Sequence, residues 1–432
     1  MKKNQFVQLL LALSLLLLLL TACITSKKSN PHLHQEIGQQ ADEIFDKLVN
    51  IRRDLHQYPE LAGLEKRTSE IIADYLSNLG LEVKTGIAGY GVVGILKGGK
   101  EGKNIAWRAD MDAVRSWIPE KGAFKSKIRG AQHSCGHDIH IAIGLGIAEV
   151  LSQNKASING TVYFIFQPEE ETFLGAKNMA SSDLFPAMTI DEIYTLHVTA
   201  LPLGQLMVKA NELYAYQKRI KFTFDSQFSE DDAKALYDTI RKEMLRKEEG
   251  GNPWEVQKAF DSNIGIHQPN TIFKDYCFLQ ERAIIKADSH QLIVVAELYE
   301  TNESNVSKLL PKIKRIINQS AFKDAFIDAS YIMENPTVMN HPQLTNDASN
   351  VLNTIYGEGT VVPSYGQIPY FNDDFIYFQQ QVPGVYFLLG GSNLEKGIFA
   401  MNHAPNFRVD ETCIKIGIQS FSSLIFERTN RE

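Results

Sequence analysis

The chain of 432 residues has few cysteines, no excess of positive charge and only one long hydrophobic run. Its four cysteines stand at positions 23, 135, 277 and 413, a spacing that does not suggest a disulfide framework. The formal net charge of -7 provides no basic footprint, so we expect no nucleic-acid partner. Internal repeats are absent. What remains is an ordinary globular composition, 44% hydrophobic and 22% charged, long enough for about two or three domains.

The one long hydrophobic run, Val7–Leu20, follows a basic start and is typical of a signal peptide. Residues 20–23 read Leu-Thr-Ala-Cys and resemble a bacterial lipobox, where the chain is cut before the cysteine and the new N-terminus is lipidated. We therefore predict a lipoprotein signal peptide at 1–22, a tether at 23–35 and a lipid anchor at Cys23. This places the protein in the bacterial cell envelope, at the periplasmic or the outward face of the outer membrane. The alternative is an ordinary secretory signal in which Cys23 is incidental.

Two short segments carry a high density of metal-binding side chains. Residues 135–140 read Cys-Gly-His-Asp-Ile-His, and Cys-x-His spacing lets one turn supply both Cys135 and His137 as zinc ligands. About thirty residues on, a buried-type apolar strand at 162–166 ends near three carboxylates at 169–171. One carboxylate suits a metal, while its neighbour suits proton transfer from the attacking water to the leaving group. These segments predict a metal-dependent hydrolase.

Several polar residues follow apolar segments that read as strands. We predict strands at 82–85, 91–96, 105–108, 161–166, 193–196 and 385–389, and helices at 36–57, 68–79 and 140–152. Asp112, Glu170, Glu171 and His197 each come just past such a strand, and His403 follows the last one after a glycine-rich turn. Ligands bind outside the carboxyl ends of strands in open α/β sheets, so these residues are expected to meet. From local sequence alone, either of the two histidines is only a weak ligand candidate.

The middle of the chain has a different pattern. From about residue 218 to 332 it alternates like strands and contains two amphipathic helices, starting near Ser229 and Ser304. The order strand, helix, strands, helix, strand is typical of a small ferredoxin-like α+β domain inserted into the larger α/β domain. We predict the larger domain at 36–215 and 334–432, and the inserted domain at 216–333.

The chain resembles the peptidase M20 family, in its amidohydrolase branch of hippurate, N-acyl-amino-acid and auxin-conjugate hydrolases. The matching segments occur in family order at residues 52–61, 108–112, 134–140, 167–171 with 175–177, 196–197, 336–338, 374–375 and 403–405. The resemblance implies a zinc-peptidase-like catalytic α/β sheet domain with an inserted lid, and two divalent metal ions (zinc first; manganese, cobalt or nickel as alternatives). It also implies a small amide or short-peptide substrate and a possible homodimer through the lid.

Carried over residue by residue, the resemblance places the metal ligands at Cys135, His137, Glu171, His197 and His403. It places the general base at Glu170, in a register set by residues 175–177, and matches Asp112 to the acid that orients the site. The implied reaction is metal-assisted hydrolysis of an amide bond. In it, Glu170 takes a proton from the attacking water and gives it to the leaving amine.

The inserted domain departs from the family pattern. The family's lid histidine, which helps to hold the reacting carbonyl, has no counterpart in residues 225–230, and Glu300 falls where an arginine is common. A carboxylate there is expected to repel the acidic end of an N-acyl amino acid. The first hypothesis is therefore a metal-dependent amidohydrolase or peptidase with an altered clamp. The alternatives are a catalytically impaired metal- or ligand-binding lipoprotein, and a lipoprotein whose motifs serve only packing.

Overall fold

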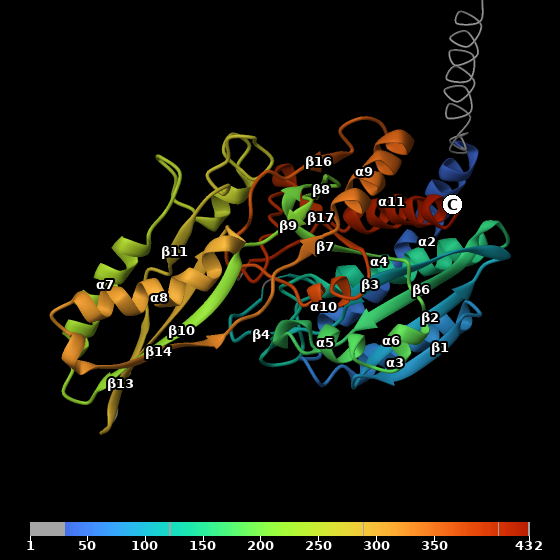
Figure 1. Ribbon diagram of the computed structural model, residues 1–432. Helices are drawn as coiled ribbons and strands as arrows, with labels where there is room; N and C mark the ends of the chain where they lie inside the picture. The colour runs from blue at the N-terminus through green and yellow to red at the C-terminus, as the bar shows by residue number, and fades with distance from the viewer. Residues whose placement is uncertain (1–30, 121, 288, 405, 431–432) are drawn as a thin grey trace, which may run out of the picture.

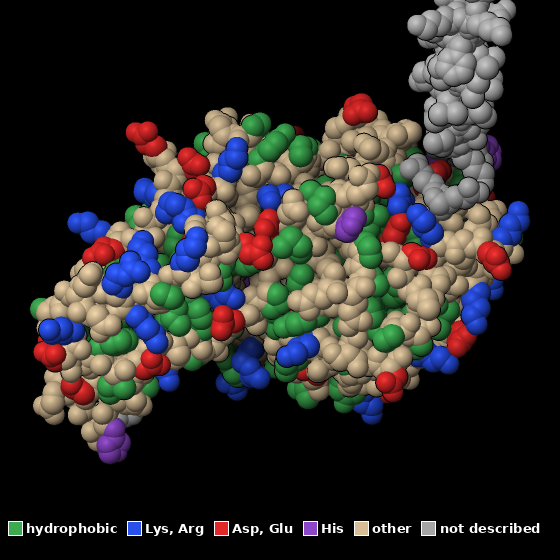
Figure 2. Space-filling view, in the orientation of Figure 1, with side chains coloured by type: hydrophobic (Ala, Val, Ile, Leu, Met, Phe, Trp, Pro, Cys, Tyr) green, Lys and Arg blue, Asp and Glu red, His purple; other side chains and the backbone are tan. Residues whose placement is uncertain are grey.

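The computed structural model describes residues 31–120, 122–287, 289–404 and 406–430. The predicted signal peptide at 1–22 and the anchor at Cys23 lie outside these residues and stay predictions. None of the described helices is both long and apolar enough to span a membrane. On the face shown in Figure 2, basic and acidic side chains are interspersed rather than sorted by sign.

The first described helix, α2 (Pro31–Gln57), corrects the predicted tether at 23–35, because residues 31–35 are helical. Leu33 and His34 are buried in the fold. The two ring nitrogens of His34 lie 3.0 Å from Ser423 Oγ and 3.0 Å from a carboxylate oxygen of Glu427, both on the last helix. These contacts with the last helix stabilise the first turn of α2, and the local sequence around His34 does not predict them.

The larger domain is built on an eight-stranded mixed sheet (Figure 1). Across the sheet the strands are β1 (Glu82–Ile87), β2 (Gly91–Lys97), β6 (Asn159–Gln167), β3 (Lys100–Asp110), β7 (Glu192–Pro202), β17 (Gly384–Ser392), β8 (Leu206–Val208) and β16 (Val361–Pro363). The central strands β6, β3, β7 and β17 are parallel. Apolar residues follow one another along them because helices or loops cover both faces.

Three helices pack together on one face of this sheet: α2, α4 (His137–Gln153) and α11 (Thr412–Thr429). Helix α4 is buried from His137 to Leu151, as its nearly continuous apolar sequence predicts. A methyl group on Gly146 would lie 2.3 Å from Ile418 Cδ1, so glycine is needed where α4 crosses α11. Helices α3 (Lys66–Asn78) and α9 (Pro342–Tyr356) extend the same hydrophobic core.

The opposite face carries the short helices α5 (Gly175–Ala180), α6 (Leu184–Ala187) and α10 (Ile376–Gln379). Two small ribbons complete the domain. They pair β4 (Val114–Arg115) with β5 (Ala131–Gln132), and β9 (Asn211–Glu212) with β15 (Met339–Asn340).

The inserted domain, here called the lid, lies to one side of the larger domain (Figure 1). Its antiparallel sheet has the order β11 (Cys277–Leu279), β13 (Gln291–Glu300), β10 (Tyr216–Asp225) and β14 (Phe326–Met333), with β12 (Ile284–Ala287) also paired to β13. Helices α7 (Glu230–Met244) and α8 (Glu303–Gln319) share its hydrophobic core. This strand order is ferredoxin-like, so the predicted α/β fold with a ferredoxin-like insertion is confirmed. The exact domain limits stay a prediction.

One part of the insertion packs against the larger domain instead of the lid sheet. We call residues 259–276 the strap. Its Ile266, Phe273 and Tyr276 are buried in the core beneath the main sheet. The backbone N–H groups of Tyr365 and Gln367 donate to carbonyls of Ile266 (2.6 Å) and Phe273 (3.0 Å). The Tyr276 hydroxyl donates to the Gln367 carbonyl at 2.9 Å. The strap therefore fastens the lid to the larger domain, a feature that the sequence reading did not predict.

Candidate metal centre

The predicted site residues gather at the carboxyl edge of the central strands. Strand β3 ends at Asp110, which pairs with Gln167 at the end of β6. Asp112 follows β3, while Glu170 and Glu171 follow β6 in a short 3-10 turn. Neighbouring parallel strands that end at one level place the residues that follow them close together.

The position of His197 requires a correction. It does not lie past the end of a strand over 193–196, because β7 continues to Pro202. Leu388 of β17 pairs with His197, and the β7–β17 ladder carries the strand beyond the level where β3 ends. The side chain still reaches the site, because its position on β7 lies beside the end of β3.

The Cys-Gly-His segment places its two donors at the start of α4. Gly136 has a φ of 101°, and a methyl group there would lie 2.5 Å from Val198 Cγ1, so this turn requires glycine. The side-chain Nδ2 of Asn402 donates to the backbone carbonyls of Cys135 (2.7 Å) and Val198 (2.9 Å). The backbone N–H of His403 donates to the Ser134 carbonyl at 2.8 Å. These bonds fix the late loop that carries His403 against the early Cys-Gly-His turn.

The five predicted ligands and Glu170 fall into overlapping groups of donor atoms. Within each group, all donor atoms lie within 4.8 Å of one another. The groups are Cys135 with His137 and His197, Cys135 with Glu171 and His403, and His137 with Glu170 and Glu171. The arrangement thus brings together side chains that are spread over most of the sequence.

His137 and His197 are both buried, and each points one ring nitrogen at the site. His137 Nδ1 lies 2.8 Å from the Asp112 carbonyl oxygen, which accepts its hydrogen bond, and the buried Nε2 has no hydrogen-bond partner within the part of the chain that the structure describes. His197 Nδ1 lies 2.9 Å from the Val198 carbonyl oxygen, and its Nε2 lies 3.3 Å from Cys135 Sγ. A backbone acceptor on Nδ1 sets the tautomer in which Nε2 can bind a metal. His403 Nε2 lies 3.1 Å from a carboxylate oxygen of Glu171.

Asp112 holds the two glutamates in place from behind. Its carboxylate accepts the backbone N–H of Glu170 at 3.1 Å and that of Glu171 at 3.0 Å. One of its oxygens also lies 3.3 Å from His137 Nδ1. Asp138, which follows His137 in the sequence, pairs instead with Arg52 and His56, at 2.7 Å from each. Asp112 is fully buried, so it shapes the site without facing solvent.

The site concentrates acidic groups that are removed from water. Burial and the charges of Asp373 and Glu171 raise the pKa of Glu170 well above its usual value. Burial and the carboxylates of Glu171 and Glu170 likewise raise the pKa of the Cys135 thiol. Burial disfavours the charge on His137, but Asp110 and Asp112 outweigh it and raise the pKa of His137 to about 10. Such a cluster favours positive charge at its centre.

A second buried network of charged side chains supports the site, and Arg108 lies at its centre. Arg108 is fully buried and pairs with Asp110 (2.6 Å), Asp373 (3.0 Å) and Asp374 (3.3 Å). Asp110 also lies 2.5 Å from His140 Nδ1. The charged sequence Arg-Ala-Asp at the end of β3 is the signal that such a network exists. The carboxylates from residues 373 and 374 can be assigned to it only in three dimensions.

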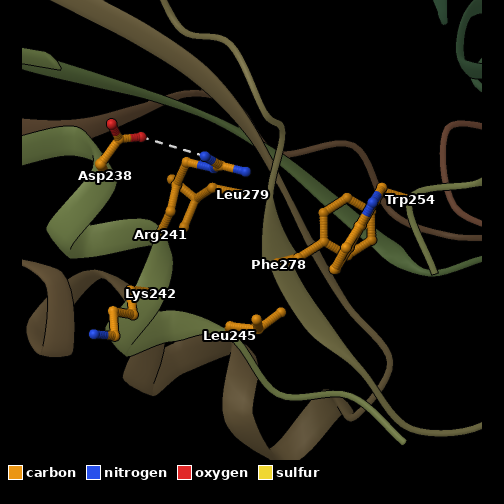
Figure 3. Close-up of a pocket in the computed structure, with 7 residues that line it drawn as sticks. All are labelled: Asp238, Arg241, Lys242, Leu245, Trp254, Phe278 and Leu279. Carbon is orange, nitrogen blue, oxygen red and sulfur yellow. Dashed lines mark hydrogen bonds and ion pairs between the residues drawn. The ribbon is translucent and has the colours of Figure 1, made fainter. Parts of the chain in front are cut away.

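A cavity of about 360 Å³ opens over these groups. Cys135, Glu170, Glu171, His197 and His403 line it from the larger domain, and the lid contributes Gln217 and Val256. A second cavity, of about 430 Å³, lies within the lid between α7 and the Trp254–Phe278 pair (Figure 3). Among the described residues that line this second cavity, the only possible metal ligand is Asp238, which pairs with Arg241 at 3.3 Å. The metal chemistry therefore belongs to the first cavity.

The two departures in the lid have local explanations. Residues 225–230 form the turn from β10 into α7, where Ser229 Oγ accepts the backbone N–H of Asp232 at 3.1 Å and caps the helix. Glu300 is fully buried and forms a two-pronged ion pair with Arg246. The expectation that Glu300 repels the acidic end of a substrate is therefore wrong, because its charge is enclosed and balanced inside the lid.

The chain is similar to known proteins over most of its length. The model of peptidase family M20/M25/M40 matches residues 106–427. Thermostable carboxypeptidase 1 of Saccharolobus solfataricus is 31% identical, over 92% of this chain and 100% of that protein. IAA-amino acid hydrolase ILR1-like 5 of Arabidopsis thaliana is 28% identical, over 96% of this chain and 95% of its own. A crystal structure of a dinuclear metal binding peptidase of the M20 family from Bacillus subtilis superposes with a TM-score of 0.70 and 24% identity, over 89% of this chain and 98% of its own.

Proposed function

This chain belongs to peptidase family M20/M25/M40 and is a hydrolase of amide or peptide bonds, and on that premise we propose its reaction. We propose that it cleaves the amide bond of N-acyl amino acids or short peptides, with two divalent metal ions bound and with Glu170 as general base. One observation supports this most strongly. Five donor side chains converge beside a buried glutamate, and four of the five line one cavity together with that glutamate.

The donors fit a pair of divalent metal ions. The buried Nε2 of His137 has no hydrogen-bond partner among the described residues, as expected of an atom that serves as a ligand. A carboxylate oxygen of Glu171 lies 3.1 Å from Nε2 of His403, another predicted ligand. Cys135, His137, Glu171, His197 and His403 would hold the metals, and a set with one thiolate and three imidazoles favours zinc, with manganese, cobalt or nickel as alternatives. When bound, such metals lower the pKa of water and polarise the substrate carbonyl.

Glu170 is placed to move the proton that hydrolysis requires. It lines the cavity, and one of its carboxylate oxygens lies 3.8 Å from His137 Nε2. Its raised pKa makes the carboxylate a better proton acceptor. Glu170 takes one proton from the attacking water and delivers it to the amide nitrogen as the C–N bond breaks. The products are a carboxylic acid and an amine.

Asp112 is a positioning residue in this scheme. It is not among the described residues that line the cavity, but it holds the backbone of both glutamates and lies against His137. Its carboxylate therefore fixes the distance between the proton carrier Glu170 and the ligand Glu171.

The test is to replace Glu170 by glutamine and to use Glu169→Gln as the matched control. Glu169 is the adjacent glutamate, but it does not line the cavity. We expect Glu170→Gln to lower kcat for N-acyl amino acids, amino-acid amides or dipeptides by about 10²–10⁴-fold. Its content of two metals per chain should be unchanged, and Glu169→Gln should behave like the native chain.

Two results would contradict the proposal. Native turnover by Glu170→Gln would show that Glu170 is not the general base. Loss of turnover in Glu169→Gln, with Glu170→Gln unaffected, would show that Glu169 has that role instead. Tight metal binding by the native chain without turnover of any of these substrates would favour the alternative, a catalytically impaired metal- or ligand-binding protein.

A further inference from the structure

Strand β7 loses its neighbour on one side just before it reaches the candidate metal centre. The last pair in the parallel ladder between β3 and β7 joins Arg108 to Thr195. His197 comes two residues later, where β17 still pairs with β7 on the other side. Buried backbone N–H and C=O groups are rarely left without a partner, so the β3 side of β7 needs other hydrogen-bond partners beyond Thr195.

Two side chains supply these partners at Val198. The backbone N–H of Val198 belongs to the peptide unit that directly follows His197, and it donates to Nε2 of His140 at 2.9 Å. The carbonyl oxygen of Val198 accepts a hydrogen bond from Nδ2 of Asn402, also at 2.9 Å. This oxygen is the one that lies 2.9 Å from Nδ1 of His197. The backbone beside the His197 ring is therefore fixed at both its donor and its acceptor.

Both ring nitrogens of His140 are engaged. Because Nε2 accepts a hydrogen bond, the proton of the ring is on Nδ1, which donates to a carboxylate oxygen of Asp110 at 2.5 Å. Arg108 pairs with the other oxygen of that carboxylate at 2.6 Å. Asp110, His137 and His140 place donor atoms within 4.8 Å of one another. His140 nevertheless offers no free nitrogen to a metal, because both of its nitrogens already have protein partners.

The rings of His140 and His197 are in direct contact. Their centroids lie 4.5 Å apart in an edge-to-face arrangement, and both rings are buried. Nε2 of His197 lies 3.3 Å from Cys135 Sγ, on the side of the candidate metal centre. His140 is in the first turn of α4, three residues after the predicted ligand His137. One turn of helix therefore supplies one predicted ligand and supports a second.

We infer that His140 is a positioning residue for His197. It binds no metal itself, and it holds the backbone of β7 at Val198 so that Nε2 of His197 faces the metal position beside Cys135. The bond to Asp110 fixes the tautomer of His140, and the bond to Val198 transmits the position of His140 to the ligand. This inference rests on the proposed function, because it takes His197 as a metal ligand.

The test uses two amide substitutions, each of which keeps one of the two hydrogen bonds. In His140→Gln the amide reaches the position of Nε2, and its oxygen accepts the Val198 N–H. In His140→Asn the amide reaches only the position of Nδ1, so the bond to Asp110 is kept and the Val198 N–H is left unpaired. We expect zinc affinity, measured by competition with a coloured chelator, to fall about 10–100-fold in His140→Asn and less than about threefold in His140→Gln.

His34→Asn is the control for a loss of stability alone. His34 is also buried and bonded through both ring nitrogens, but its partners are Ser423 and Glu427 on α11. None of these three is among the described residues that line the cavity over the metal centre. His34→Asn should therefore lower the midpoint of thermal unfolding and leave zinc affinity native.

Two further measurements ask through which residue His140 acts. In the His197→Ala background, His140→Asn should cause no further loss of zinc affinity, because the ligand that His140 positions is gone. The metal-free native chain needs no substitution. Its imidazole nitrogen chemical shifts should place the ring proton of His140, and that of His197, on Nδ1.

Equal losses of zinc affinity in the two His140 variants, or no loss in either, would overturn the inference. So would losses in His140→Asn and His197→Ala that add in full, or a His140 ring proton on Nε2. None of these measurements needs turnover. A chain that shows the expected binding but hydrolyses no substrate would overturn the proposed reaction and support the inference. Native zinc affinity in His197→Ala would overturn the inference and leave the Glu170 test of the reaction unaffected.

Discussion

Asp112→Asn is expected to disturb the site more than its distance from the cavity suggests. In the native chain, each carboxylate oxygen accepts one backbone N–H, from Glu170 or from Glu171. An asparagine keeps only one acceptor oxygen and turns an NH₂ group towards the other N–H. One charge-assisted hydrogen bond is therefore lost, and a buried donor is left facing another donor.

The magnitude follows from that loss. A hydrogen bond to a charged group contributes about 1.5–3 kcal/mol, so we expect the free energy of unfolding to fall by about 2–3 kcal/mol. The turn that carries Glu171 should also loosen. Losing an outer partner of this kind lowers metal affinity by about 10–100-fold. Activity should fall together with metal affinity, and added metal should restore part of it.

Urea unfolding of the metal-free chain measures the first effect, and competition with a chromophoric chelator measures the second. Asp191→Asn is a suitable control, because Asp191 also accepts a backbone N–H, from Asn104 at 2.8 Å, but at the surface and away from the site. That variant should lose about 0.5 kcal/mol or less and bind metal normally. Native stability and native metal affinity in Asp112→Asn would refute the reasoning.

Two further predictions concern buried charge. Burial raises the pKa of Glu65 to about 7, from an ordinary 4.5. The contribution of its neutral form to stability is thus present below pH 4.5 and is lost as the pH rises through 7. Glu65→Gln should raise the free energy of unfolding by about 1–3 kcal/mol at alkaline pH and change it little in acid, in urea titrations at both pH values; an equal effect at both would contradict the sign. Arg108→Met should lower that free energy by about 3–5 kcal/mol, because it leaves three aspartates without a counter-charge. Unchanged thermal unfolding of Arg108→Met would show that those carboxylates are neutral.

The sequence by itself determined the fold class and predicted which side chains carry the proposed chemistry. The spacing of Cys135 and His137, and the carboxylates that follow an apolar strand, are local features that depend only on neighbouring residues. The apolar runs of the central strands and of α4 are likewise local, since a segment covered on all sides must be apolar nearly throughout. These features were enough to predict the α/β fold and a metal-dependent hydrolase. The order of strands and helices in the middle of the chain predicted the ferredoxin-like insertion, and the order of the motifs along the chain indicated the family.

The tertiary structure decided which partner each charged or polar group finds. His34 starts α2 early because it meets a helix nearly 390 residues away, and His197 lies inside β7 because β17 continues to pair with it. Glu300 is paired with Arg246 inside the lid rather than facing the cavity. The strap packs against the larger domain instead of against the lid sheet. In each case the residue or segment could have packed against several distant parts of the chain, and the folded structure selects one of them. Local sequence carries no information about that choice, because the free energy that settles it arises only when the surfaces meet.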